Sequence, residues 1–575
     1  MTFPELTDNA LRIMERRYLL RDEDSKLIED AEGMFRRVSD NVGLGYEQMR
    51  RLEFLPNSPT LMNAGTGVQQ LSACFVIPVE DSIESIYDAI KYAAIIHQSG
   101  GGTGFSFSSL RPEGDIVHST GGVASGPVSF MKVFDAATEA IKQGGRRRGA
   151  SMGVLSVHHP DIRRFVRAKR ERSLSNFNIS VAATDVFMEA VEEGKSIPLV
   201  NPRTGRAVGR EDARGLLWEM ADNAWRSGDP GMIFIDEVNR HNPIPGLGKL
   251  EATNPCGEVP LHPFEACNLG SIDLSKFLTD GRIDRERLEE TVDVAVTFLD
   301  NVIDVTRYPL MQTERVVKGN RKIGLGVMGF ADLLIAMGIR YGSRDSVKVA
   351  EELMGTIRTR AEEATARLGE ERGDFPNIDL SVHSPPRRNA TVLSVAPTGS
   401  ISIIADCSSG IEPLFAVCYT KHVLDGAQLR MVNPAFMRVS KERGFHSDEL
   451  MMRIAKEHSI QSIDGIPEDV KEVFVTAHDV PFKEQVEVQA AFQRHVDNSV
   501  SKTVNLPEGA TVHDVYEAYI LAYTLGCKGI TVYREGSRSE QVITVISDIC
   551  PSCGGSIRAV DGAFVCPTCG RGREA

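Results

Sequence analysis

Asn254, Cys256 and Glu258 occupy alternate positions in the segment ATNPCGEVPLHPFEACNLGS. In an extended loop, alternate side chains point to the same side, so we expect these three polar groups to share one side. A thiol between a carboxylate and a carboxamide suits chemistry on a hydroxylated substrate, because Glu258 can take or give a proton while Asn254 holds a second oxygen. Cys267, eleven residues further on, is placed to meet a thiol from a distant part of the chain.

Free cysteines are most often small buried hydrophobic residues. We adopt this interpretation for three single cysteines, Cys407, Cys418 and Cys527. The neighbours of Cys256 are Pro, Gly, Asn and Glu, which fit poorly into a buried strand or helix. The sequence therefore favours a chemical role for Cys256.

Two Cys-Pro-x-Cys-Gly motifs, CPSCGG and VCPTCGR, lie twelve residues apart near the end of the sequence. Four thiolates at this spacing are typical of a tetrahedral zinc site. The expected ligands are Cys550, Cys553, Cys566 and Cys569. The alternative is that one pair acts as a redox-active dithiol.

The segment TVLSVAPTGSISII predicts a strand, a tight turn and the start of a helix. Exposed backbone N–H groups and the positive end of a helix favour an anion at such a turn. The alternative is an ordinary capped helix. The candidate phosphate-binding residues are Pro397, Thr398, Gly399, Ser400 and Ile401.

The elements that must position these residues alternate along the chain. Apolar runs typical of strands, LSACFVIPV, TGFSFSSL, ASMGVLSV and LSNFNISVAAT, alternate with the helical patterns ARGLLWEMADNAWRSG, LEETVDVAVTFLDNVIDVT and VYEAYILAYTLG. This alternation predicts an α/β core, and it does not distinguish an open sheet from a barrel. We expect a helical region over residues 1–70, with Thr7 or Asp8 as a helix N-cap, a catalytic domain over 71–540 and a tail module over 541–575.

Composition limits the classes of function. The 575 residues are 42% hydrophobic and 25% charged, with a net charge of −14, which predicts a globular protein and argues against binding a nucleic acid through its phosphates. A nucleotide ligand remains possible. No segment approaches the roughly 20 apolar residues of a membrane span. The scattered cysteines argue against a secreted disulfide framework, so we expect a cytoplasmic protein.

Six segments, in this order, resemble landmarks of the ribonucleotide reductase family: LPNSPTLMNAG, LSACFVIPVEDS, SGGGTGFSFSSLRPEGD, QGGRRRGASMG, NPCGE and APTGSISIIADCSSGIEP. The resemblance implies a ten-stranded α/β barrel with Cys256 on a central finger loop. It implies that Cys256 forms the thiyl radical that removes the 3′ hydrogen of the ribose, with Asn254 and Glu258 as its partners. Cys74 and Cys267 would be the reducing pair, which ends the cycle as a disulfide.

The resemblance also implies binding sites. The turn from Pro397 to Ile401 would hold the substrate phosphates, and Ser58, Ala73 and Gly102 match further substrate contacts, with Gly102 allowing close approach. Asp81 and Ser82 match positions that bind a deoxynucleoside triphosphate effector, and Arg146 and Arg147 lie in the loop GGRRRG that relays effector identity. A solvated basic turn is the alternative for that loop. The expected partners are a thioredoxin-like or other dithiol reductant and a second copy in a homodimer.

The source of the radical indicates the class. Two-subunit reductases use two adjacent tyrosines, whereas here Val532 precedes Tyr533. No glycyl-radical segment is evident in the tail. We therefore expect an adenosylcobalamin-dependent (class II) enzyme that acts on ribonucleoside diphosphates, with triphosphates left open. The alternatives are the large subunit of a two-subunit (class I) reductase and a non-catalytic nucleotide-binding or zinc-ribbon regulatory protein.

Overall fold

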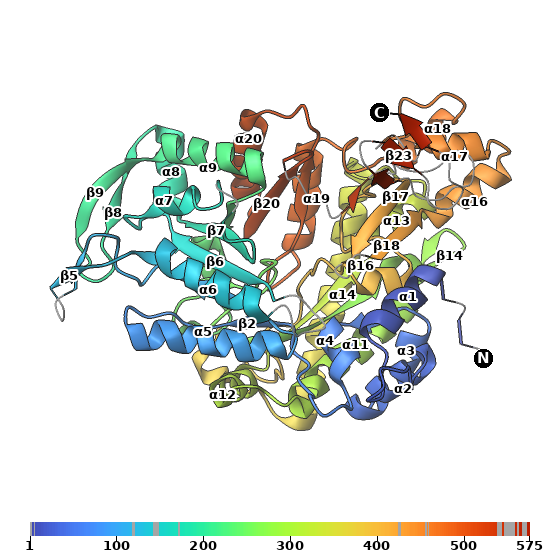
Figure 1. Cartoon of the computed structure of the whole chain (residues 1–575). Coiled ribbons are helices and arrows are strands. Elements are labelled where there is room, and N and C mark those ends of the chain that lie inside the picture. Colours follow the sequence, from blue (N-terminus) through green and yellow to red (C-terminus); the bar gives the residue numbers. More distant parts are fainter. Residues whose placement is uncertain are drawn as a thin grey trace. The chain divides into compact units, whose positions relative to one another are not determined.

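The computed structural model describes the chain apart from residues 1–2, 5, 118–120, 142–148, 171–172, 424–426, 455–456, 458, 538–542, 545–557, 561–562, 566–571 and 575. The chain forms two compact units (Figure 1). The first comprises Met1–Glu412 and Val480–Arg538, and the second comprises Pro413–Asp479 and Ser539–Ala575. Among the described residues, no helix has both the length and the apolar composition that a membrane crossing requires.

The first unit begins with short helices, as the sequence predicts. They are α1 (Asp8–Arg17), α2 (Ala31–Val42), α3 (Tyr46–Arg50) and α4 (Ser58–Asn63). Thr7 is the N-cap of α1, because its side chain accepts a hydrogen bond from the amide of Ala10. One face of α1 is buried through Ile13 and Met14, which holds the helix against the rest of the unit.

A ten-stranded mixed sheet forms the centre of the first unit. Its order is β1 (Phe54–Pro56), β13 (Ala266–Asp273), β2 (Cys74–Val76), β3 (Gly102–Ser106), β6 (Ser151–Ser156), β7 (Phe177–Ala183), β10 (Gly231–Phe234), β20 (Gly529–Arg534) and β19 (Thr503–Leu506), with β16 (Ile323–Met328) also paired to β13. The strands from β2 to β10 are parallel, whereas β13 and β20 pair with the ends of this block in antiparallel orientation. The four expected strands correspond to β2, β3, β6 and β7.

Beyond β16, hydrogen bonds continue through residues 391–395. Leu325 bridges Leu393, and Val395 bridges Val500 in parallel orientation. Residue 500 lies just before β19. The strand expected at residues 391–395 therefore forms isolated bridges rather than a continuous ladder.

Helices connect the strands, as expected for an α/β core (Figure 1). The helices predicted near 213–228, 288–306 and 515–526 are α9 (Ala213–Ser227), α11 (Arg285–Val305) and α20 (Val512–Thr524). The other helices are α5 (Ile83–Gln98), α6 (Pro127–Ile141), α7 (Ile162–Val166), α8 (Asp185–Glu193), α10 (Ile235–Arg240), α12 (Met311–Asn320), α13 (Phe330–Ala336), α14 (Arg344–Arg372), α15 (Ile401–Ala405) and α19 (Phe482–Gln493). Two-stranded hairpins are formed by β4 (Ile116–Val117) with β5 (Gly122–Val123), β8 (Ser196–Val200) with β9 (Ala207–Asp212), β11 (Ala252–Thr253) with β12 (Pro260–Leu261), and β14 (Leu278–Thr279) with β15 (Arg282–Ile283).

In the second unit, the described residues form two small antiparallel sheets and three helices. One sheet has the order β18 (Ala427–Val432), β17 (Cys418–Val423) and β21 (Ile543–Thr544), and the other has the order β22 (Arg558–Val560), β23 (Ala563–Val565) and β24 (Gly572–Glu574). The helices are α16 (Pro434–Glu442), α17 (Asp448–Ile454) and α18 (Glu468–Val473). Because β21 pairs with β17, residues 543–544 of the expected tail share a sheet with residues 418–432.

Candidate active site

Cys256 lies at the tip of the β11–β12 hairpin. The strands pair through Ala252 with Leu261 and Thr253 with Pro260. At the tip, the amide of Gly257 donates to the carbonyl of Asn254 over 3.1 Å, and Gly257 has a φ of +82°, a conformation that glycine adopts without strain. The expected extended loop is therefore a tight turn, because Gly257 reverses the chain there.

This turn separates the three polar side chains. The Cys256 thiol is exposed, whereas Asn254 and Glu258 are only 1% and 2% exposed. The Asn254 side-chain oxygen accepts a hydrogen bond of 3.0 Å from the amide of Val259. The thiol is thus presented at the tip, while the amide and the carboxyl group are held in the buried base of the hairpin.

Two glycines of β3 allow the hairpin to lie close to the sheet. A Cβ atom at Gly104 would lie 1.7 Å from the carbonyl oxygen of Thr253, and one at Gly102 would lie 2.9 Å from Cγ of Pro255. The side-chain amide of Asn178 donates to the carbonyl of Pro255 over 2.9 Å. A side chain at residue 102 would therefore collide with Pro255. The contact of Gly102 with substrate stays a prediction.

The other arm of the hairpin is attached to the segments beyond β16. The carbonyl of Glu258 accepts hydrogen bonds of 2.9 Å from the Ser394 hydroxyl and from the amide of Ser499. The hairpin is consequently fixed on both sides, by β3 and Asn178 on one and by Ser394 and Ser499 on the other. Such anchoring positions a reactive side chain more accurately than a loose loop would.

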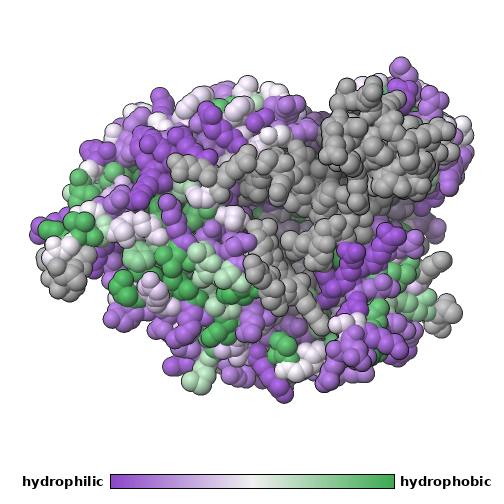
Figure 2. Space-filling model, in the orientation of Figure 1, coloured by the Kyte–Doolittle hydropathy of each residue, from purple (hydrophilic) through white to green (hydrophobic). Residues whose placement is uncertain are grey.

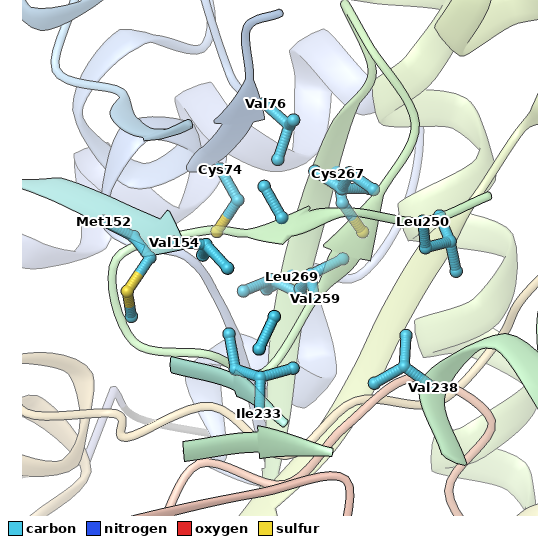
Figure 3. Packing of buried hydrophobic residues seen from close by; sticks show 13 residues of the cluster. Cys74, Val76, Met152, Val154, Ile233, Val238, Leu250, Val259, Cys267 and Leu269 are labelled. Carbon is cyan, nitrogen blue, oxygen red and sulfur yellow. The ribbon is translucent and has the colours of Figure 1, made fainter. Parts of the chain in front are cut away.

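Cys74 and Cys267 face each other across two strands. They form a directly opposed antiparallel pair between β2 and β13, both are buried, and neither is in a disulfide. Opposed residues in antiparallel strands have Cα atoms about 4.5–5.5 Å apart, which falls within the range that a disulfide requires. Figure 3 shows both side chains entering the apolar cluster that also contains Val259 and Leu269.

The two thiols have different hydrogen-bonding environments. The Asn254 side-chain amide donates to Sγ of Cys74 over 3.1 Å, so this sulfur acts as an acceptor. The Cys267 thiol donates to the carbonyls of Asn268 and Lys322 at 3.4 and 3.8 Å. Burial, reinforced by the negative charge of Glu265, raises the pKa of Cys267 well above its usual value. Cys267 is therefore held as a protonated thiol.

A buried charged cluster lies behind Cys267. The ammonium group of Lys322 and the carboxylate of Glu265 form an ion pair of 2.9 Å in which both side chains are at most 1% exposed. The Asn320 side-chain amide and the amide of His262 donate to Glu265 over 2.5 and 2.8 Å. Neither ring nitrogen of His262 has a hydrogen-bond partner among the described residues. Burial and the nearby Lys322 lower the pKa of His262 to about 4.

The candidate phosphate turn has a defined backbone. Thr398 has a φ of +54°, and its hydroxyl accepts a hydrogen bond of 2.7 Å from the amide of Gly410. The amide of Ser402 donates to the carbonyl of Thr398 over 3.0 Å. The expected helix is present as α15, although it is only five residues long. The amides of Ile403 and Ile404 both donate to the carbonyl of Ser400, so the first turn of α15 is hydrogen-bonded to the turn that precedes it.

The structure brings most of the remaining predicted substrate contacts to the same strands. The amide of Ala73 donates to the carbonyl of Cys267, and its carbonyl accepts from the amide of Gly102, which is paired in register with Cys74. Ser58 is the first residue of α4, one residue after Asn57, whose amide donates to the carbonyl of Leu269 in β13. Ala73 and Gly102 thus adjoin the two thiols.

Asp81 and Ser82 form a separate group at the start of α5. Ser82 is the N-cap of this helix, and Asp81 forms an ion pair of 2.8 Å with Arg111. Arg146 and Arg147, and the four tail cysteines Cys550, Cys553, Cys566 and Cys569, lie outside the described residues. Cys418 and Cys527 are buried, as expected, and Cys407 is half-buried.

Sequence reasoning missed several side chains near the site. The pairing of Lys322 with Glu265 could not be found from spacing, because the two residues are 57 positions apart. Glu265 directly precedes β13 and Lys322 directly precedes β16. Arg17 and Tyr18 belong to a helix pattern, where they resemble ordinary surface and core positions. Their hydrogen bonds to Ser400 and Ser58 depend on how α1 packs.

Comparisons with known proteins agree with this geometry. The sequence matches the family model described as ribonucleotide reductase, barrel domain, over residues 72–387 and 380–533, and that described as ribonucleotide reductase, all-alpha domain, over residues 4–69. A vitamin B12-dependent ribonucleoside-diphosphate reductase of Thermoplasma acidophilum is 46% identical over 94% of this chain and 80% of its own length. A protein of the same name from Mycobacterium tuberculosis (strain CDC 1551 / Oshkosh) is 49% identical over 93% of this chain and 80% of its own length.

The fold is similar to that of a solved structure. The alpha subunit of the class Id ribonucleotide reductase of Actinobacillus ureae superposes with a TM-score of 0.77 and 22% sequence identity, covering 92% of this chain and 97% of that one. At this level of identity, the likeness concerns the fold alone.

Proposed function

The chain belongs to the ribonucleotide reductase family, and from this premise we propose that it reduces ribonucleoside diphosphates to 2′-deoxyribonucleotides in a vitamin B12-dependent reaction. The observation that carries the proposal is the direct opposition of Cys74 and Cys267 beside a hairpin that presents Cys256. The names of relatives 46% and 49% identical to the chain support both the diphosphate substrate and the cofactor.

Cys256 is the residue that we assign to the radical step. As a thiyl radical, it removes the 3′ hydrogen of the ribose, Glu258 moves the proton of a ribose hydroxyl, and Asn254 holds a second ribose oxygen. Adenosylcobalamin, when bound, supplies the one-electron chemistry that generates the thiyl radical. The exposure of Cys256 at the hairpin tip fits this requirement, because a thiol in the buried base of the hairpin could not meet a bound cofactor.

Cys74 and Cys267 supply the reducing equivalents. The C2′–O bond breaks and the hydroxyl leaves as water, while the two thiols give up two electrons and two protons and form one disulfide. The opposed positions of the two residues support this step, since the disulfide can form without breaking the pairing of β2 with β13. A thioredoxin-like protein or another dithiol then restores the thiols.

The substrate phosphates are proposed to bind at Pro397 to Ile401, the turn that leads into the short helix α15. Ser58, Ala73 and Gly102 would contact the rest of the nucleotide. The hydrogen bonds that link Ala73 to both Gly102 and Cys267 support this arrangement. The same turn could also hold a triphosphate.

We further propose that the sheet closes as the ten-stranded barrel that the sequence resemblance implies. The bridges Leu325–Leu393 and Val395–Val500 support closure, because they extend the hydrogen-bonded path from β16 towards β19. The division into residues 1–70, 71–540 and 541–575 remains the domain proposal.

Regulation is proposed to involve a homodimer that binds a deoxynucleoside triphosphate effector at Asp81, Ser82, Arg146 and Arg147. The helices α5 and α6 pack side by side, and apolar residues gather over them in Figure 2. Ile83 and Tyr87 of α5 are 58% and 54% exposed. Exposed apolar side chains in such a cluster are typical of a protein interface.

For the tail, we propose a zinc site formed by Cys550, Cys553, Cys566 and Cys569. The antiparallel pairing of Arg558 with Val565 supports it, because the chain enters and leaves the β22–β23 hairpin at neighbouring positions. The two cysteine pairs flank that hairpin in sequence. The alternative is that one pair shuttles electrons to the Cys74–Cys267 disulfide.

Reduction of CDP by the purified chain tests the main proposal. The assay is anaerobic, contains dithiothreitol and a panel of deoxynucleoside triphosphates, and is run with and without adenosylcobalamin. We expect formation of dCDP only when the cofactor is present. Turnover that instead required a separate diiron or dimanganese subunit would establish the two-subunit alternative.

A further inference from the structure

The end of α1 reaches two of the proposed substrate-binding positions. The guanidinium of Arg17 donates to the Ser400 hydroxyl over 3.3 Å. The hydroxyls of Tyr18 and Ser58 form a hydrogen bond of 2.8 Å. Helix α1 also packs against α15, which begins directly after Ser400. Arg17 and Tyr18, which are consecutive in the sequence, thus contact two different parts of the proposed substrate site. Arg17 contacts Ser400 of the phosphate turn, and Tyr18 contacts Ser58.

The position of Arg17 is set by its neighbours in the helix. Ile13, Met14 and Tyr18 are at most 2% exposed, so they fix the last turn of α1 against the unit. Arg17 lies at the edge of this buried face and is half-buried, whereas the adjacent Arg16 is exposed. The aliphatic part of Arg17 is therefore packed while its guanidinium group extends to the phosphate turn.

The turn itself carries no positive charge. Its five residues, Pro397 to Ile401, are uncharged, and α15 has only five residues, so its dipole provides limited compensation for an anion. A nucleoside diphosphate carries several negative charges that a binding site must stabilise. Arg17 brings a cation to this turn from a different part of the chain.

We propose that Arg17 is a substrate-binding residue that pairs with the terminal phosphate of the ribonucleoside diphosphate, so that the N-terminal helical region completes the substrate site. The inference rests on the proposed function. The planar guanidinium group of arginine can donate two parallel hydrogen bonds to a phosphate. In that state, the phosphate takes the place of Ser400 as the acceptor, and the Ser400 hydroxyl is able to donate to the same anion. Tyr18 is a positioning residue that holds Ser58.

Binding measurements on the full chain separate a phosphate contact from a merely structural one. Arg17→Gln and Arg17→Lys are compared with Arg16→Gln, a matched control on the same turn of α1. Equilibrium dialysis gives Kd for CDP and for cytidine, and anaerobic assays give KM and kcat. We expect Arg17→Gln to weaken CDP binding about tenfold or more and leave Kd for cytidine unchanged. Arg17→Lys should be intermediate, and Arg16→Gln should match the wild type.

Two results with the variants would overturn the inference. One is an unchanged Kd for CDP in Arg17→Gln. The other is an equal weakening of CDP and cytidine, which would mean that Arg17 only attaches α1 to the unit. If Arg17→Gln does not fold, the comparison of CDP with cytidine in Arg17→Lys decides between the same outcomes. If the wild-type chain binds CDP no better than cytidine, the proposed function is wrong and the inference about Arg17 is wrong with it. If the wild type reduces CDP and Arg17→Gln binds CDP normally, only the inference about Arg17 is wrong.

Discussion

Cys74 and Cys267 lie directly opposite each other on the antiparallel strands β2 and β13, although 193 positions separate them in the sequence. Cys74 accepts a hydrogen bond from Asn254 of the hairpin that carries Cys256. This contact links the proposed reducing pair to the proposed radical residue. A substitution or oxidation of Cys74 therefore alters a hydrogen bond of Asn254, at the base of the hairpin.

The opposed thiols predict a single turnover in the absence of an external reductant. The wild-type chain, pre-reduced and then freed of dithiothreitol, should form at most one dCDP per chain and lose two titratable thiols, because one disulfide stores two electrons. Cys267→Ser should form no dCDP. Cys527→Ala is the matched control, since Cys527 is also buried but lies elsewhere. Continued dCDP formation by Cys267→Ser would show that another thiol supplies the electrons.

Gly104→Ala should displace the hairpin from β3. The added Cβ atom would lie 1.7 Å from the carbonyl oxygen of Thr253, and two backbone segments cannot relax as a flexible side chain can. We expect a loss of about 3 kcal/mol of stability, in the range of overpacked cores, together with loss of CDP reduction. Urea unfolding and the activity assay measure the two effects. Gly67→Ala, where the added atom meets nothing within 4 Å, should behave as the wild type in both.

Lys322→Met should be strongly destabilising. It leaves the carboxylate of Glu265 buried without its cation, a change that typically costs about 3 to 5 kcal/mol. The double variant Lys322→Met with Glu265→Gln should recover part of this loss, because it removes the unpaired charge. Lys348→Met breaks an exposed ion pair with Asp345 and should leave the unfolding midpoint in urea unaltered. Equal midpoints for Lys322→Met and Lys348→Met would contradict the assigned role of the buried pair.

His262 should make stability fall as the pH is lowered. Its folded pKa of about 4 lies below the usual value of about 6.5, so the unfolded chain takes up a proton first. The contribution of His262 is therefore lost between about pH 6.5 and pH 4, and it amounts to about 2 kcal/mol between pH 7 and pH 5. Urea unfolding at both pH values should give a smaller difference for His262→Gln than for the wild type. An identical difference would mean that His262 takes up its proton over the same pH range in the folded and the unfolded chain.

Local features of the fold could be predicted from the sequence. The Thr7 cap, the strands β2, β3, β6 and β7 and the helices α9, α11 and α20 follow from capping chemistry and from apolar periodicity, which act between residues close in the chain. The N-P-C-G-E segment and the order of the six motifs indicated the family in the same way. In each case, the relevant residues are neighbours in sequence.

Tertiary structure decided the relationships among distant residues. Periodicity carries no information on which strands pair, so the opposition of Cys74 and Cys267 followed only from the family resemblance until the register of β2 and β13 placed them. The expected extended loop is a turn, because Gly257 adopts a positive φ and the hairpin closes on β3. The buried pair of Lys322 and Glu265 and the contact of Arg17 with Ser400 arise from packing. The sequence by itself determined which chemical groups are present, and only the folded chain determined which of them meet, because long-range pairing depends on the whole core.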